Sequence, residues 1–153
     1  MEPKFTVSGR ISKPVHDVFE AVADPNKLSS YFTTGGAKGR LDVGAEVTWD
    51  FADFPGAFPV KVVEVIPDEK IVLRWGAADD GDEGGVYDTT VTMTFSPLDG
   101  GTRTLVTITE EGFRPNDAGR KASYNNCEGW TGMLCAMKVF LEHGINLREG
   151  FYK

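Results

Sequence analysis

The chain has 153 residues, and 16 Lys and Arg against 23 Asp and Glu give it a net charge of −7. Hydrophobic residues make up 41% of the sequence, which is typical of a globular protein with one buried core. The negative charge argues against nucleic acid and against anionic membrane surfaces as partners, because Lys and Arg make most of those contacts.

Targeting signals and metal motifs are both missing from the sequence. No apolar run approaches the roughly 20 residues of a spanning helix, and the first residues lack the layout of a signal peptide. We therefore expect a cytoplasmic protein without membrane insertion. Cys127 and Cys135 lie too far apart along one predicted helix to form a disulfide, so both are expected to be buried free thiols. No Cys or His motif predicts a metal site, and no cofactor is expected.

The first part of the chain predicts one strand and two helices. Residues 5–11 alternate loosely between apolar and polar side chains, as in a half-buried strand. Apolar residues at helical spacing over 15–22 follow Pro14, and Asp24-Pro25 ends this helix. A short second helix carries apolar residues over 28–32.

The middle of the chain predicts a series of strands. The strands are expected over residues 46–51, 58–66, 71–75, 87–95 and 106–109. Only short turns, such as 67–70 and 97–101, separate them. Because parallel neighbours need long crossovers, the strands should form an antiparallel meander.

The last predicted element is the longest helix, which ends at His143-Gly144. It carries one apolar stripe, formed by Cys127, Trp130, Leu134, Met137 and Leu141. A sheet with one apolar face needs a cover, and this helix is the only element long enough. We expect an α+β helix-grip fold, in which a curved antiparallel sheet wraps around the C-terminal helix.

Several segments resemble the START-like (SRPBCC) superfamily. Residues 14–25, 62–67 and 73–75 carry the resemblance, while Gly112-Phe113 and residues 129–144 are similar to one branch of it. That branch is related to the C-terminal domain of the heat-shock-protein ATPase activator. The resemblance implies a single START-like domain over residues 1–153. It also implies a ligand pocket between sheet and helix, and a small hydrophobic molecule, a second copy of the chain or a chaperone as partner.

The expected binding residues are aromatic and sulfur-containing side chains that converge between sheet and helix, together with one carboxylate. Their alternative role is to fill the core. The set is Trp49, Phe51, Phe54, Phe58, Trp75, Tyr87, Met93, Glu110, Phe113, Trp130, Met133, Leu134 and Met137.

Glu110 is the one charged member of this set. It continues the inward face of Val106 and Ile108 by the period of two, so Glu111 should face solvent. The alternative is that the strand ends or bulges before Glu110. An inward Glu110 would orient a ligand or serve in acid–base chemistry.

Three functions remain open on the sequence alone. The preferred one is binding of a small hydrophobic or amphipathic ligand, with no catalytic residue assigned. A cyclase- or aromatase-like enzyme using the same pocket is the second, and a chaperone-interaction module with an acidic surface is the third. The acidic stretch 79–85 is expected to be a solvated loop, with a calcium site as the less favoured alternative.

Overall fold

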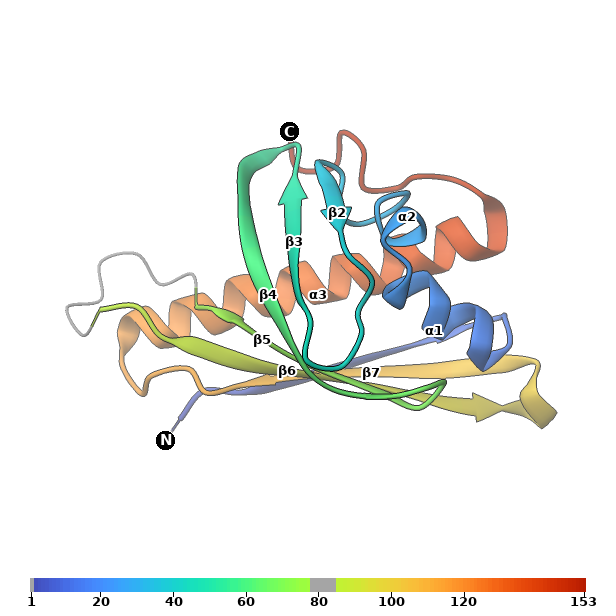
Figure 1. Ribbon diagram of the computed structural model, residues 1–153, viewed down its shortest axis with the longest axis horizontal. Helices are drawn as coiled ribbons and strands as arrows, with labels where there is room; N and C mark the ends of the chain where they lie inside the picture. Colours follow the sequence, from blue (N-terminus) through green and yellow to red (C-terminus); the bar gives the residue numbers. More distant parts are fainter. Residues whose placement is uncertain (1, 78–84) are drawn as a thin grey trace.

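In the computed structural model, which describes residues 2–77 and 85–153, seven strands form one antiparallel sheet. Its strand order is β1-β7-β6-β5-β4-β3-β2. The strands are β1 (Phe5–Ile11), β2 (Gly36–Lys38), β3 (Glu46–Phe51), β4 (Phe54–Ile66), β5 (Lys70–Gly76), β6 (Asp88–Leu98) and β7 (Arg103–Glu111). The sheet is strongly curved, so that β2, β3 and β4 run at a large angle to β6, β7 and β1 (Figure 1).

Helices cover the concave face of this sheet. They are α1 (Val15–Ala23), α2 (Pro25–Leu28) and α3 (Asp117–His143), and a single 3-10 turn, η1 (Asp99–Gly101), joins β6 to β7. Helix α3 runs the length of the molecule, and α1 and α2 lie beside its C-terminal half (Figure 1). The predicted α+β helix-grip fold is confirmed. No helix of the described residues is both long and apolar enough to cross a membrane.

The sheet follows the alternation in the sequence. In β6 and β7 the inward side chains pair across the strands, Met93 opposite Ile108 and Phe95 opposite Val106. All four are buried, because the helices cover this face. β-Branched Thr residues fill several intervening positions, Thr90, Thr92 and Thr94 of β6 and Thr107 and Thr109 of β7, where they suit a pleated surface.

Some boundaries differ from the prediction. Strand β4 begins at Phe54, four residues earlier than expected, and β6 begins one residue after Tyr87. Strand β2 was not predicted, because three residues at the sheet edge carry no periodic signal. Helix α2 ends at Leu28, although the following Tyr31 and Phe32 are buried as expected.

Helix α3 is capped at both ends. The Asn116 side chain accepts a hydrogen bond from the Gly119 amide (2.8 Å), and Gly144 ends the helix with a φ of 70°. Its buried stripe includes Trp130 and Met137, as predicted. The cysteines are free, but Cys127 is only partly buried and Cys135 is exposed, so the prediction of buried thiols is wrong. Both line a hollow between α3 and the segment that follows it.

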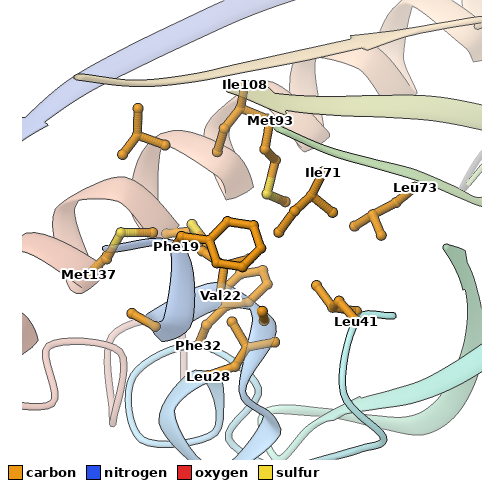
Figure 2. Close-up of a cluster of buried hydrophobic side chains, with 14 of the residues drawn as sticks. Phe19, Val22, Leu28, Phe32, Leu41, Ile71, Leu73, Met93, Ile108 and Met137 are labelled. Carbon is orange, nitrogen blue, oxygen red and sulfur yellow. The ribbon is translucent and has the colours of Figure 1, made fainter. Parts of the chain in front are cut away.

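The middle of the space between sheet and α3 is filled. Phe19 and Val22 of α1 enter the same buried cluster as Met137 of α3 and Ile71 and Met93 of the sheet (Figure 2). The ring of Phe19 meets that of Phe95 edge-on at 5.5 Å. A ligand site therefore has to lie elsewhere along the helix.

Candidate ligand-binding site

The side chain of Glu110 is completely buried near the end of β7. Strand β7 continues to Glu111, so the period of two holds to its end and Glu111 is exposed. Glu110 stands opposite Val91 of β6 and Phe5 of β1. The strand pairing thus turns the carboxylate toward α3.

Four uncharged donor groups surround this carboxylate. Oε2 accepts hydrogen bonds from the indole Nε1 of Trp75 (2.9 Å) and from the hydroxyl of Thr89 (2.6 Å). Oε1 accepts one from Nε1 of Trp130 (2.9 Å). The Asn126 amide nitrogen lies 3.2 Å from Oε1 and 3.1 Å from Oε2. Among the described residues no Lys or Arg pairs with Glu110, so hydrogen bonds alone offset its desolvation.

These bonds fix two tryptophans side by side. The rings of Trp75 and Trp130 are 5.3 Å apart, and Phe32 stacks on Trp130 at 5.6 Å. Because both indole N–H groups are bonded to Glu110, the polar edges of the rings face the carboxylate. The three rings form one aromatic wall that joins β5, α3 and the turn after α2.

A hollow of about 530 Å³ lies against this wall. It opens between the β3–β4 turn, the N-terminal half of α3 and the segment that follows α3. Its surface is mostly aromatic, with polar groups at a few places. The lining residues are Phe32, Phe51, Phe54, Trp75, Asn125, Asn126, Glu128, Gly129, Trp130, Arg148 and Tyr152. We call this hollow the aromatic cavity.

The structure brings four of the sequence-predicted site residues to the aromatic cavity: Phe51, Phe54, Trp75 and Trp130. Glu110 lies behind its wall. Phe58 stands one ring further back, 5.9 Å from Phe51 and 5.8 Å from Trp75.

The other predicted residues lie in the core or at a separate place. The buried core residues are Trp49, Met93, Met133, Leu134 and Met137. Phe113 is buried beside Phe5. Tyr87 lies beneath the guanidinium of Arg114, and its hydroxyl accepts a hydrogen bond from the Arg114 amide.

Seven lining residues escaped the sequence reasoning: Phe32, Asn125, Asn126, Glu128, Gly129, Arg148 and Tyr152. Asn126 precedes Trp130 by one helical turn, so their shared face was a usable signal. For Arg148 and Tyr152 no pattern existed, because the segment after Gly144 has no regular structure.

Arg148 ties this last segment to the sheet. Its Nη2 donates to Oδ1 of Asp53 in the β3–β4 turn at 3.0 Å, and both side chains are largely buried. The guanidinium lies 4.9 Å from the ring centre of Phe51 and 4.8 Å from that of Tyr152. The segment is therefore one wall of the aromatic cavity.

In the described part of the chain, no group of three or more His, Cys, Asp or Glu side chains is placed to hold a metal ion. The predicted acidic loop lies outside the described residues except for Gly85.

Comparison with known proteins gives a family and a fold. The model of the family described as "Activator of Hsp90 ATPase homolog 1-like protein" matches residues 12–142. Among solved structures, the crystal structure of SSP2350 from Staphylococcus saprophyticus is 27% identical with a TM-score of 0.78, covering 95% of this chain and 96% of that one. No curated protein sequence matches the chain.

Two more distant structures share the fold. The Aha1 dimer from Colwellia psychrerythraea is 17% identical with a TM-score of 0.70, covering 93% of this chain and 98% of that one. DynU16, a protein of the dynemicin biosynthetic locus, is 21% identical with a TM-score of 0.74, covering 94% of this chain and 49% of that one.

Proposed function

The chain belongs to the family of activator of Hsp90 ATPase homolog 1-like proteins, and on this basis we propose that it binds a small, flat hydrophobic or amphipathic molecule in the aromatic cavity. One observation carries the proposal. The indole N–H groups of Trp75 and Trp130 are both bonded to Glu110, and the partly exposed ring of Trp75 faces a hollow of about 530 Å³ with Phe51 and Phe54. Volumes of this size and apolar walls with a few polar groups are typical of small-molecule sites.

The shape of the walls favours a planar ligand. Phe51, Phe54 and Trp75 keep exposed ring surface in the lining, so a flat ring system inserted beside them gains stacking contacts. Glu110 keeps both indoles in one orientation, which lowers the cost of ordering them on binding. Glu110 thereby acts as a positioning residue.

We favour binding over a cyclase- or aromatase-like reaction. A general acid or base has to reach the reacting atoms, at about 3 Å or through one water. Glu110 is fully buried, and each of its oxygens already accepts at least two hydrogen bonds. It is also absent from the lining of the aromatic cavity.

Interaction with a chaperone is a second candidate, favoured by the description of the family and by the likeness to the Aha1 dimer. Stimulation of the ATPase rate of a purified Hsp90-type chaperone tests it. A rate unchanged by a molar excess of this protein contradicts it. Sedimentation of the protein alone tests whether a second copy is a partner.

The ligand proposal is tested by filling the aromatic cavity from Gly129. A Cβ at this position meets no neighbouring atom within 4 Å, so a Phe side chain has room to enter the hollow. We expect wild-type protein to bind 2-ethylnaphthalene with one-to-one stoichiometry in equilibrium dialysis, and Gly129→Phe to lose this binding.

Gly129→Ala is the matched control. It adds one carbon, should keep the binding, and should raise the stability of α3 by up to about 1 kcal/mol because Ala is the better helix former. Urea unfolding of both variants checks that they fold. A folded Gly129→Phe protein that binds like the wild type contradicts the proposed site.

A further inference from the structure

Arg148 is a buried cation with few partners. Its side chain is only 9% exposed, and its one hydrogen bond among the described residues joins Nη2 to Asp53. The Nε atom is buried without any hydrogen-bond partner in the described part of the chain. A guanidinium carries five N–H donors, so most of its capacity is unused.

Such a group calls for an explanation. Buried donors in folded proteins are nearly always satisfied, and an unsatisfied one lowers stability, more so when it is charged. Asp53 balances the charge of Arg148 and attaches the segment after α3 to the sheet. It accepts only one of the N–H groups of the guanidinium. An acceptor from outside the chain would use the Nη donors that Asp53 leaves free, because Nε is enclosed by the protein.

The surroundings of the guanidinium point to where this acceptor sits. Arg148 lines three hollows of the described residues, and only one of them is also lined by Phe32 and Phe51. The guanidinium carbon lies 6.0 Å from the Phe32 ring centre and 4.9 Å from that of Phe51. It is thus packed among the rings of the aromatic cavity.

Several other polar groups of this cavity are less suited to bind an acceptor. The amide nitrogen of Asn126 and the indoles of Trp75 and Trp130 donate to Glu110. Glu128 at the margin is exposed and negative, so it offers no donor. Arg148 is the one cation among the lining residues.

We propose that the Arg148 guanidinium anchors an oxygen acceptor, a carbonyl or a carboxylate, carried by a flat aromatic ligand in the aromatic cavity. This inference rests on the proposed function and adds the chemical class of the ligand. The rings gain contact from the aromatic walls, and the oxygen accepts from the guanidinium in an apolar surrounding, where such a bond is strong. The ion pair with Asp53 holds the guanidinium in place.

Three matched probes separate the contributions. 2-Ethylnaphthalene has no acceptor, 2-acetylnaphthalene has a carbonyl in the same position, and 2-naphthoate has a carboxylate. We expect wild-type protein to bind at least one of the two oxygen-bearing probes about tenfold more tightly than 2-ethylnaphthalene, as for one hydrogen bond to a charged donor. The acetyl and carboxylate arms decide which oxygen the site takes.

Two variants separate the anchor from the attachment of the segment. Arg148→Met and Asp53→Asn both break the ion pair, but only Arg148→Met removes the donor. We expect Arg148→Met to bind all three probes with similar affinity. Asp53→Asn should keep the preference for oxygen and favour 2-naphthoate further, because the competing carboxylate is gone.

The outcomes distinguish this inference from the proposed function. Equal binding of all three probes by the wild type, or a preference retained by Arg148→Met, overturns the anchor while the aromatic site stands. Loss of the preference in both variants assigns Arg148 to attachment alone and also overturns it. Failure of the wild type to bind any probe overturns the proposed function and the anchor together.

Discussion

At the scale of single residues, Glu110 shows how a carboxylate is kept inside an apolar region without a cation. Two neighbouring indole N–H groups donate to different oxygens of it, Trp75 to Oε2 and Trp130 to Oε1. Thr89 and Asn126 complete the set. Hydrogen bonds from several neutral donors offset the desolvation of the carboxyl group and at the same time orient the donors. The same contact therefore determines both the burial of Glu110 and the geometry of the aromatic wall.

This arrangement predicts that Glu110→Gln is destabilising. The amide has one oxygen and one nitrogen, and the indoles lie on different oxygens of the present carboxylate. Whichever way the amide turns, one indole N–H faces an NH₂ group and loses its acceptor. Thr89 and Asn126 can reorient, but an indole cannot. We expect a loss of about 1–3 kcal/mol in the free energy of unfolding, measured with urea.

Glu111→Gln is the neighbouring control. Glu111 is exposed, and its contact with Lys4 is long (3.8 Å), so its loss should stay within about 0.5 kcal/mol. Equal effects of the two substitutions would refute the role assigned to Glu110.

At the scale of elements, most strands and the two main helices were predictable. Each of them buries one face, so its apolar residues recur with the period of a strand or a helix. Glu110 is an example: its inward direction followed from Val106 and Ile108 by alternation. Its partners did not follow, since Thr89, Trp75 and Trp130 come from three different elements. Knowing that they meet requires the register of β5, β6 and β7.

The site was less predictable than the fold for a physical reason. Sequence reasoning placed the ligand pocket between sheet and helix without fixing its position along the helix, and Phe19 and Val22 of α1 fill the middle of that space (Figure 2). The aromatic cavity lies instead beside the β3–β4 turn, where Arg148 and Tyr152 close it. Side chains in an irregular segment are positioned by tertiary contacts alone, which no local pattern encodes.

One contact between elements predicts a pH dependence. The Nδ1 atom of His16, in the first turn of α1, lies 3.0 Å from Oδ1 of Asp68 in the β4–β5 turn. The hydrogen bond and the charge of Asp68 raise the pKa of His16 above its ordinary value of 6.5. Asp68→Asn should lower the pKa of His16 in an NMR titration.

The effect on stability has a definite sign. Because the pKa of His16 is raised in the folded state, the stabilisation is fully present below the unfolded value of 6.5 and is lost as the pH rises through the folded value. Both side chains are exposed, so the effect should be small. The difference in urea midpoint between wild type and Asp68→Asn should be larger in favour of the wild type at about pH 5.5 than at about pH 8.5. An equal difference at the two pH values would contradict this assignment.

At the scale of the whole molecule, the fold separates a filled centre from an open end. Helices α1 and α3 and the inner face of the sheet form one continuous cluster. The aromatic cavity adjoins this cluster but is closed on one side by the segment after Gly144, which returns along α3 toward β3 and β4 (Figure 1). A ligand in the cavity would therefore contact both the rigid body and this last segment.

This arrangement predicts that a bound probe protects the last segment from hydrogen exchange. The amide of Glu149 donates to the side chain of Asn146 and that of Phe151 to the carbonyl of Arg148, both at 3.1 Å, so both amides exchange only after the segment opens. Opening removes Arg148 and Tyr152 from the cavity wall, so a bound probe has to dissociate or lose those contacts first. With the preferred naphthalene probe at 100 times its Kd, exchange at these amides should slow by up to about 100-fold.

The turn at Asp99–Gly101 lines no part of the cavity and opens independently, so its exchange should not change. In Gly129→Phe the probe should have no effect at either place, because the cavity is filled. Unchanged exchange at Glu149 and Phe151 in probe-saturated wild type would mean that the segment after α3 is not a wall of the occupied site, and the anchor assigned to Arg148 would fall with it.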